Sequence, residues 1–407
     1  MEGNGVMAAS TATPQVAVVG GAGHVGAPLA MVLAHHGFPT LIHDLNVRTM
    51  ELLASGKLPF LEEGAEPLLR EVLAKGMLTF DSRPSSLKGV PYVVVTIGTP
   101  IDEFHNPMLG VVQKCIDELA PHLDDDQTII LRSTIFPGVT EYVHEYLRAK
   151  GKRIHVAFCP ERVVQGYSIR ELQALPQIIS GATPEAEEKA VQLFSKIAPK
   201  LVRMGTKEAE FAKLISNAYR YIQFAATNQF YTMVESAGVS YSRVLAGLKE
   251  DYPRLADLPG PGFAAGPCLF KDTLQLAAYT NNTFGLGYAA MQVNEGLPAF
   301  LVGRMQEQYR LKESTVGILG MAFKSESDDT RASLSYKLRK LLQYHARAVV
   351  STDPFVKTDP TLLPLEEVVA KSDILVLAAP HKAYRSLDLQ GKPLVDVWNF
   401  HRPAKNA

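Results

Sequence analysis

Residues 15–44 read QVAVVGGAGHVGAPLAMVLAHHGFPTLIHD, and this stretch predicts the fold of the first part of the chain. A short β-branched run over 15–19 ends in glycines, and a helical pattern follows over 25–36. A second apolar run over 40–43 closes on Asp44. Strand, glycine turn, helix, strand and acid within about 30 residues is the opening of a βαβ unit.

The glycine turn of this unit fits the GxGxxG pattern of a dinucleotide-binding loop. Its candidate cofactor-binding residues are Gly21, Gly23, His24, Val25 and Gly26. The first glycine permits a tight turn, the second lets a pyrophosphate approach, and the third lets the helix pack on the strand. The helix N-terminus then offers free N–H groups to the anion. Asp44 stands where an acid binds a ribose 2′-hydroxyl, which favours NAD over NADP, although the neighbouring Arg48 leaves NADP open.

The composition narrows the class of protein. The chain has 407 residues, of which 46% are hydrophobic and 20% are charged, as in a globular protein with a large core. A formal charge of −1 argues against a general nucleic-acid binder. We find no apolar run of about 18 residues and no signal-peptide layout in the small, polar segment 1–14. We therefore expect a cytoplasmic protein with no membrane partner and a disordered leader over 1–14.

The pattern of apolar runs predicts α/β structure at both ends of the chain and helices between them. The expected strands, which alternate with helical stretches, cover 92–96, 128–131, 155–158, 315–319, 348–351, 373–377 and 393–396. From 208 to 237 there is no glycine or proline, and apolar spacing predicts a long buried helix that joins two domains or pairs in a dimer. We expect two Rossmann-like domains joined by this long central helix and a helical region.

The three cysteines occupy unlike positions. Cys115 lies in a helical stretch and Cys159 ends a strand, which is typical of buried structural thiols. Cys268 follows the Pro/Gly-rich loop 253–267 and precedes Lys271. Their odd number and scatter fit neither a disulfide framework nor a zinc site, so we expect a reducing compartment, no metal, and a chemical role for Cys268.

The cysteine loop carries a specific resemblance. Residues 260–272, GPGFAAGPCLFKD, resemble the catalytic loop GxGFGGxCxxKD of the UDP-glucose/GDP-mannose dehydrogenase family. Further segments match that family in the same order along nearly the whole chain: TIGTP at 96–100, STIFPG at 133–138, CPER at 159–162, KLISN at 213–217, GMAFK at 320–324 and DDTR at 328–331.

This resemblance implies an NAD-dependent enzyme that oxidises the C6 hydroxyl of a UDP-sugar to the uronic acid in two hydride transfers. A thiolate suits that reaction, because it holds the aldehyde as a thiohemiacetal, which is oxidised to a thioester and hydrolysed. The implied domains are an NAD-binding Rossmann domain over 15–205, a central helical dimerisation region with the cysteine loop over 206–300, and a nucleotide-sugar-binding α/β domain over 301–407. The expected assembly is a homodimer or a higher homo-oligomer.

The same resemblance assigns catalytic roles residue by residue. Cys268 is the nucleophile, and Lys271 and Lys213 are candidate cations that lower its pKa. Lys213 and Asn217 share a helix face and stabilise negative charge at the C6 oxygen. The remaining catalytic candidates are Asp272, a proton acceptor acting with a water, Thr134, which places that water, and Glu161, which assists thioester hydrolysis.

The binding residues follow from the same motifs. Cofactor candidates beyond the glycine turn are Asp44, Arg48, Thr99, Thr134 and Arg331. Substrate candidates are Glu161, Arg162, Lys213, Asn217, Arg254, Phe263, Gly266 and Lys324, with Arg254 reaching the site of a neighbouring subunit. The sequence features that bear on the sugar disagree: some resemble the UDP-N-acetylhexosamine branch (UDP-GlcNAc or UDP-ManNAc) and others the UDP-glucose branch.

Three departures from the family pattern keep other functions open. Ala264 and Ala265 replace two glycines, Pro267 precedes the cysteine, and Trp398 replaces an arginine that often contacts the nucleotide. A catalytically quiet nucleotide-sugar binder is one alternative. Independently of these departures, the pair of Lys213 and Asn217 also suits a two-electron hydroxy-acid dehydrogenase of the 6-phosphogluconate type, which needs no Cys268.

Overall fold

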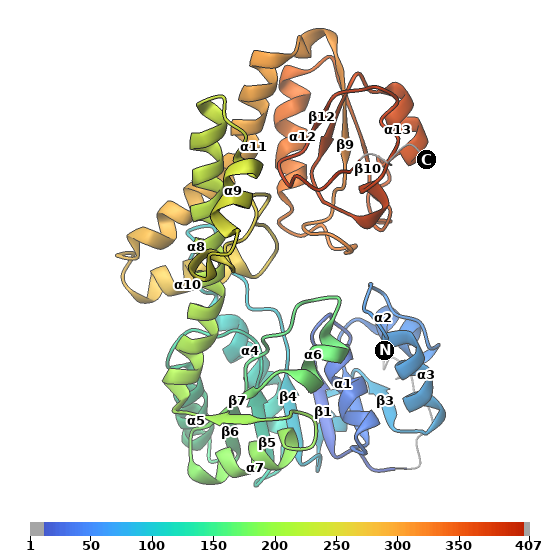
Figure 1. The fold of residues 1–407 in the computed structure, drawn as a ribbon. Helices are drawn as coiled ribbons and strands as arrows, with labels where there is room; N and C mark the ends of the chain where they lie inside the picture. The colour runs from blue at the N-terminus through green and yellow to red at the C-terminus, as the bar shows by residue number, and fades with distance from the viewer. Residues whose placement is uncertain (1–11, 403–407) are drawn as a thin grey trace. The chain divides into compact units, whose positions relative to one another are not determined.

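The computed structural model describes residues 12–402, which divide into two compact units between Ile215 and Ser216 (Figure 1). The boundary falls inside the long helix α8 (Thr206–Ser236), which confirms the long central helix expected from the sequence. The expected leader lies almost wholly outside the described residues.

The first unit is built on an eight-stranded sheet with the order β3-β2-β1-β4-β5-β6-β7-β8. Its strands are β1 (Val16–Val19), β2 (Thr40–His43), β3 (Leu78–Asp81), β4 (Tyr92–Val95), β5 (Thr128–Leu131), β6 (His155–Phe158), β7 (Gln177–Gly181) and β8 (Leu201–Arg203). Neighbouring strands are parallel except β6 and β7. The strand order reverses at β1, where a doubly wound sheet opens a crevice for a ligand.

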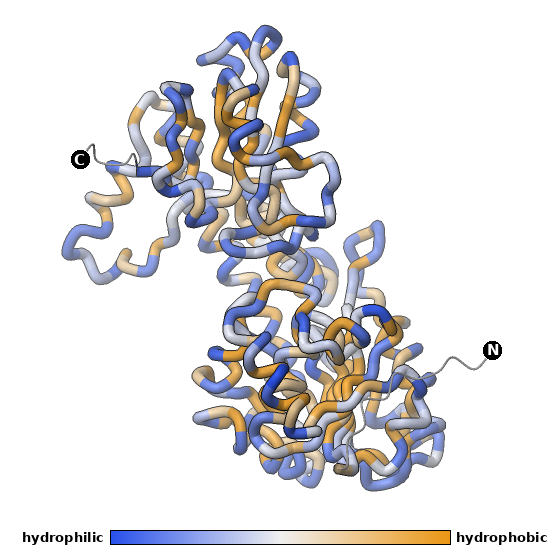
Figure 2. Tube along the Cα trace, turned by 90° about the vertical axis from the view of Figure 1, so that its right-hand side faces the viewer, coloured by the Kyte–Doolittle hydropathy of each residue, from blue (hydrophilic) through white to orange (hydrophobic). Residues whose placement is uncertain are grey.

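Helices cover both faces of this sheet, because its strands are apolar on both sides. They are α1 (Gly26–His35), α2 (Val47–Ala54), α3 (Ala65–Ala74), α4 (Leu109–Leu119), α5 (Val139–Ala149), α6 (Ser168–Ala174) and α7 (Pro184–Phe194). One core packs α1, α3, α6 and α7 on one face, and the other packs α4 and α5 on the opposite face. Figure 2 shows the hydrophobic residues gathered along the interior strands.

The second unit repeats the plan on a smaller scale. Its parallel sheet has the order β10-β9-β11-β12, with β9 (Thr315–Leu319), β10 (Ala348–Thr352), β11 (Ile374–Leu377) and β12 (Leu394–Val395). Its helices beyond α8 are α9 (Tyr241–Lys249), α10 (Leu269–Tyr279), α11 (Gly285–Gln308), α12 (Leu334–His345) and α13 (Leu365–Lys371). Helices α11 and α12 pack on one face of the sheet, and α13 packs on the other.

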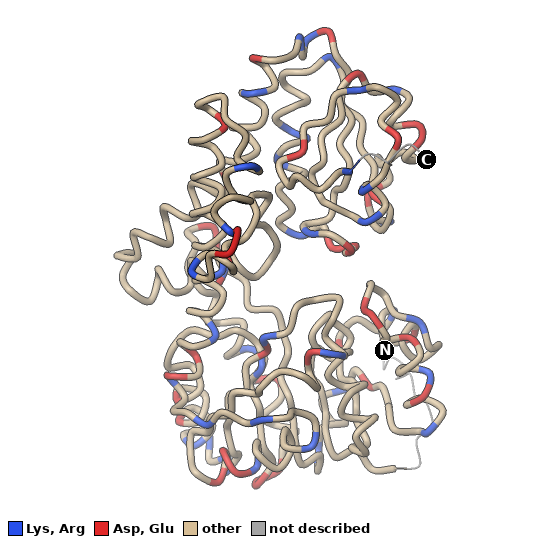
Figure 3. The backbone as a smooth tube through the Cα atoms, in the orientation of Figure 1, with Lys and Arg blue, Asp and Glu red and all other residues tan. Residues whose placement is uncertain are grey.

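The fold class expected from the sequence is confirmed: two Rossmann-like sheets are connected by α8 and a helical region. Every expected strand is present within a residue or two of its predicted ends, whereas β3, β7 and β8 were not foreseen. Basic and acidic residues are interspersed along both units (Figure 3). Within residues 12–402 no helix has the length and apolar character needed to cross a bilayer.

Candidate active site

The glycine turn of the first unit has the close packing that a dinucleotide loop requires. A Cβ on Gly26 would lie 2.5 Å from the carbonyl oxygen of Gly20, and one on Gly21 would lie 2.4 Å from that of Val18. A Cβ on Gly23 would have only one neighbour, at 3.6 Å, so its surroundings leave room for a ligand. Helix α1 begins here without a side-chain cap, which leaves N–H groups for a pyrophosphate. The turn therefore fits NAD.

Asp44 lies at the end of β2, as predicted, and its carboxylate is tied to the same turn. It accepts hydrogen bonds from the backbone N–H of Ala22 at 3.0 Å and of Asn46 at 2.9 Å. His24 stacks on the ring of Phe60, with centroids 4.2 Å apart. The cofactor candidates Val25 and Arg48 are both exposed.

Thr99 and Thr134 come together after neighbouring strands. The hydroxyl of Thr99 donates to the carbonyl oxygen of Thr134 at 2.6 Å, which joins the loop that follows β4 to the loop that follows β5. Because the carboxyl ends of parallel strands meet at one edge, these residues lie at the edge that carries the glycine turn.

Glu161 follows β6 and is held by a residue that the sequence did not single out. Its carboxylate forms an ion pair with Arg132, whose side chain is fully buried. The guanidinium of Arg162 instead donates to the carbonyl oxygen of Pro176. The carboxylate of Glu161 therefore pairs with Arg132 and not with the neighbouring guanidinium of Arg162.

Cys268 lies in the second unit, at the N-cap of α10, and is exposed. The loop before it is fixed from two sides. The backbone N–H of Gly266 donates to the carbonyl oxygen of Ala332, and Gly266 has a φ of 103°. A Cβ there would lie 2.6 Å from the ring of Phe323, so glycine is required. The partial positive charge of a helix N-terminus favours a thiolate at this position.

The other two cysteines are poor nucleophiles. Burial raises the pKa of the Cys115 thiol to about 12, and Glu118 adds to the rise. Burial raises the pKa of Cys159, which is 0% exposed, to about 12 as well. Cys268 is thus the accessible thiol of the three.

Asp272 lies one turn into α10 and is 0% exposed. The side-chain amide of Asn217, on α8, donates to its Oδ2 at 2.5 Å, and the ammonium of Lys271 lies 3.1 Å from its Oδ1. Lys213 precedes Asn217 by four residues on α8 and is 9% exposed. The structure therefore joins the buried Asn217 and Asp272 and the half-buried Lys271 in one polar cluster beside the Cys268 turn.

The departures from the family loop are accommodated without backbone strain. Neither Ala264 nor Ala265 has a positive φ, so their methyl groups are compatible with the loop. Trp398 packs on this loop: a Cβ on Gly262 would lie 2.2 Å from its ring, and the ring centroid of Phe263 is 6.4 Å away. The indole is therefore a packing partner of the cysteine loop.

The remaining candidates of the second unit, which differ in their contacts, are Arg331, Lys324 and Arg254. The guanidinium of Arg331 forms a bidentate ion pair with the carboxylate of Asp329, with Nη2 2.6 Å from Oδ2. The hydrogen bonds that Arg331 donates to Asp329 raise the pKa of Arg331, burial opposes the rise, and the nearby Cys268 adds to it. The ammonium of Lys324 lies over the ring of Phe323, and Arg254 lies exposed in a short 3₁₀ turn.

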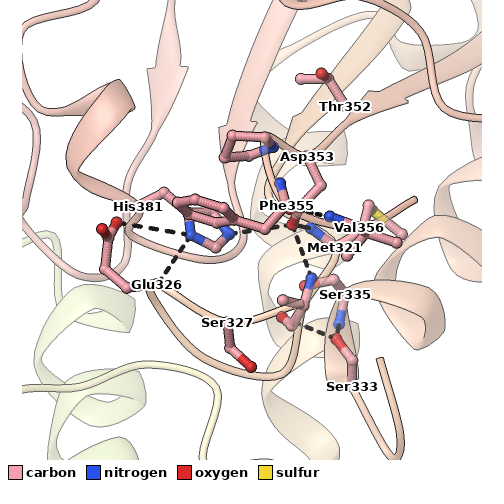
Figure 4. Close-up of polar contacts among 12 residues, drawn as sticks. Met321, Glu326, Ser327, Ser333, Ser335, Thr352, Asp353, Phe355, Val356 and His381 are labelled. Carbon is pink, nitrogen blue, oxygen red and sulfur yellow. Dashed lines mark hydrogen bonds and ion pairs between the residues drawn. The ribbon is translucent and has the colours of Figure 1, made fainter. Parts of the chain in front are cut away.

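A buried cluster in the second unit was not foreseen (Figure 4). Asp353 follows β10 as Asp44 follows β2, and its Oδ2 accepts from the backbone N–H groups of Met321 and Ala322 at 2.7 and 2.9 Å. His381 Nε2 lies 3.0 Å from the same oxygen, and His381 Nδ1 accepts from the N–H of Glu326. The turn that follows β9 at Gly320 is therefore held by the carboxylate of Asp353. The shared position of the two acids, each directly after the second strand of its unit, was the signal available in the sequence.

Comparison with known proteins assigns the chain to one family. The chain belongs to the UDP-glucose/GDP-mannose dehydrogenase family, whose NAD binding domain matches residues 14–198, central domain residues 207–296 and UDP binding domain residues 317–403. It is an enzyme of an NAD-dependent family of UDP-sugar dehydrogenases.

Among its relatives is the UDP-N-acetyl-D-mannosamine dehydrogenase of Pyrococcus horikoshii, which is 30% identical over 92% of this chain and 91% of that protein. The NDP-N-acetyl-D-galactosaminuronic acid dehydrogenase of Ralstonia nicotianae is 28% identical over 94% and 96% of the two chains. A solved structure of the UDP-D-ManNAc dehydrogenase from Pyrococcus horikoshii superposes with a TM-score of 0.88, at 28% identity over 95% and 96% of the chains.

Proposed function

We propose that this enzyme oxidises the C6 hydroxyl of a UDP-N-acetylhexosamine to the uronic acid, with Cys268 as the covalent nucleophile. The observation that carries the proposal is the polar cluster of Asn217, Asp272 and Lys271 beside an exposed cysteine at a helix N-terminus. The balanced reaction takes the alcohol, one water and two NAD⁺ to the carboxylate, two NADH and three protons. Bound NAD supplies a hydride acceptor for each of the two oxidations.

In the first oxidation Asp272, acting with a water that Thr134 helps to place, accepts the proton of the C6 hydroxyl as the hydride leaves. Asp272 suits this role because it is an anion held by fixed donors in a site from which bulk water is excluded. Lys213 and Asn217 stabilise the negative charge that develops on the oxygen. The product of this step is an aldehyde.

In the second oxidation the Cys268 thiolate adds to the aldehyde carbon, and the thiohemiacetal loses a hydride and its hydroxyl proton to become a thioester. Water then adds to the thioester carbon and the thiolate leaves, which releases the acid. Glu161 assists this hydrolysis. Arg331, whose charge is coupled to Cys268, favours the thiolate both before the addition and after the release.

The choice of sugar rests on the relatives. The curated relatives at 30% and 28% identity carry the names of dehydrogenases of N-acetylmannosamine and N-acetylgalactosaminuronic acid nucleotides. The UDP-glucose dehydrogenase of Pyrobaculum islandicum has the same fold, with a TM-score of 0.88, but only 23% identity, which supports the fold alone. We therefore expect a preference for an N-acetylated sugar.

The experiment is a panel of UDP-ManNAc, UDP-GlcNAc, UDP-GalNAc, UDP-glucose and GDP-mannose with NAD⁺, followed at 340 nm, with the acid product identified by mass spectrometry. We expect the highest kcat/KM with an N-acetylated UDP-sugar. A higher kcat/KM with UDP-glucose overturns the sugar assignment, and no NADH with any sugar overturns the proposed activity.

We further propose that the active unit is at least a dimer formed along α8, with Arg254 entering the site of the neighbouring subunit. Tyr219, Phe230 and Met233 recur at helical spacing on α8 and are 60%, 48% and 60% exposed. The molar mass of Met233→Glu, measured by light scattering, tests this dimer, with Tyr344→Ser at an exposed position on α12 as the control. A dimeric Met233→Glu protein that retains full activity contradicts it.

A further inference from the structure

Arg132 is an unusual residue for the carboxyl edge of a sheet, because its side chain is fully buried. It follows β5 directly, and β5 pairs in parallel with β6, which ends just before Cys159 and Glu161. Burying a guanidinium is costly unless every edge of it is paired. The groups that pair with the Arg132 guanidinium therefore indicate its role.

Both edges of the Arg132 guanidinium are used. Nε and Nη2 face Glu161 Oε2, with Nε at 3.0 Å. Nη1 donates to the carbonyl oxygen of Cys159 and to Oε1 of Gln177, both at 3.0 Å. The guanidinium also lies 5.1 Å from the ring centre of Phe194.

Gln177 is itself fixed, so it serves as a rigid support for Arg132. Its amide nitrogen donates to the carbonyl oxygen of Pro160 at 3.1 Å and to that of Ile178 at 2.8 Å. Arg132 is thereby connected to the ends of two further strands, β6 and β7. A planar, five-donor group held this way has one orientation available, which a lysine ammonium would not reproduce.

The second oxygen of Glu161 is fixed by the backbone. Oε1 accepts from the N–H of Arg162 at 2.7 Å and from that of Val163 at 3.0 Å. The carboxylate thus has donors on both oxygens, yet its side chain remains 12% exposed at the sheet edge. It is an oriented anion that water can still reach.

We propose that Arg132 is a positioning residue for the hydrolysis of the thioester, which it serves by fixing the carboxylate of Glu161 in the orientation that this step uses. The inference rests on the proposed function, since it concerns the step that follows the second hydride transfer. Arg132 is not needed to remove a hydride, so its loss slows the release of the acid from Cys268 and leaves the formation of the thioester comparatively fast.

The test is Arg132→Met, compared with Arg132→Lys and with Arg153→Met. Arg153 precedes β6 at its opposite end, and its exposed side chain pairs with Asp125, so its loss leaves turnover unchanged. Each variant is mixed rapidly with NAD⁺ and UDP-ManNAc, and the NADH formed in the first turnover is compared with the steady rate. The intact mass of the protein reports an acyl group on Cys268, and circular dichroism on heating reports folding.

For Arg132→Met we expect a steady rate reduced about 10²-fold, a ratio of first-turnover to steady NADH formation well above the wild-type ratio, and an acyl adduct. Arg132→Lys recovers only part of the rate. Glu161→Gln is expected to show the same slow steady rate, high first-turnover ratio and acyl adduct. The double variant Arg132→Met/Glu161→Gln is no slower than the slower of the two single variants, because the two residues act as one unit. If Arg132→Met does not fold, Gln177→Leu replaces it with the same expected signature.

An equal loss of the first-turnover and steady rates, without an adduct, overturns the inference and assigns Arg132 a purely structural role. Unchanged turnover in Arg132→Met overturns it as well. A wild-type protein that forms no NADH with any nucleotide sugar contradicts the proposed function instead, and the inference falls with it.

Discussion

The side-chain amide of Asn217 donates to Oδ2 of Asp272 at 2.5 Å, which connects α8 to the first turn of α10 just after Cys268. Lys271 lies 3.1 Å from the other oxygen of Asp272. Because both Asn217 and Asp272 are buried, the carboxylate keeps its orientation through fixed donors rather than through water. In the proposed mechanism, Asp272 is therefore a proton acceptor on the helix that begins at the nucleophile Cys268.

Replacing Asp272 by asparagine removes the charge of this acceptor and keeps its shape. We expect kcat to fall about 10²- to 10⁴-fold, which is the usual contribution of a general base, while NAD still binds. Steady-state NADH formation and NAD titration measure the two effects. Glu313→Gln, at an exposed carboxylate of the same unit, is the control. A less than threefold change in kcat would falsify this role.

We propose that Asp44 sets the preference for NAD over NADP. Its carboxylate at the end of β2 repels a 2′-phosphate and accepts a ribose hydroxyl. Asp44→Ala is expected to raise the KM for NAD about tenfold, or ~1.4 kcal/mol, and to lower the KM for NADP. Asp44→Asn controls for the bond to the N–H of Ala22, since an amide oxygen still accepts. Unaltered KM ratios in Asp44→Ala would speak against a ribose contact.

The cysteine loop offers a matched pair of glycines for a stability test. Gly262→Ala places a methyl group 2.2 Å from the Trp398 ring at a φ of 150°, whereas a Cβ on Gly260 has no atom within 4 Å. We expect Gly262→Ala to lower the free energy of unfolding by about 1–3 kcal/mol and Gly260→Ala to change it little. Urea unfolding of both variants decides the matter, and equal stability would show that Trp398 does not pack there.

Asp353 gives the second unit a dependence on pH. Burial would raise its pKa, but the hydrogen bond from His381 and those from the N–H groups of Ala322 and Phe355 together lower the pKa of Asp353 to about 2. A lowered pKa in the folded state stabilises the fold at pH values above the unfolded value of 3.8, and this stabilisation is lost as the pH falls toward about 2.

Asp353→Asn is therefore expected to unfold more easily than wild type at pH 7, by roughly 2 kcal/mol, with the difference shrinking between pH 4 and pH 2. Urea unfolding at several pH values measures this, with the exposed Asp388→Asn as control. A difference that is constant from pH 7 to pH 2 would mean that the charge of Asp353 is not what stabilises the turn.

The fold was largely predictable because its strands are apolar on both faces and its turns carry glycine. The strand β8 was missed because its three residues are half-exposed or exposed. The strand β7 was missed because it pairs with β6 in the antiparallel direction, whereas the sequence pattern predicted parallel strands joined by helical crossovers. Local sequence carries little information about such edges, which depend on tertiary pairing.

The site was predictable only where chemistry follows a motif. The family motifs single out Cys268, Asp272 and Asn217 as candidates, whereas Arg132 has no local signal, since a lone arginine after a strand is typical of an exposed residue. Its role emerges only when β5 and β6 lie side by side and place its guanidinium against Glu161.

The central claim, a four-electron oxidation through Cys268, is tested most directly by counting NADH per acid formed from UDP-ManNAc by the wild-type enzyme and by Cys268→Ser. We predict two NADH per acid for the wild type and no acid from Cys268→Ser, since a serine hydroxyl is a far weaker nucleophile than a thiolate. One NADH per product, or acid formation by Cys268→Ser at the wild-type rate, would contradict the account.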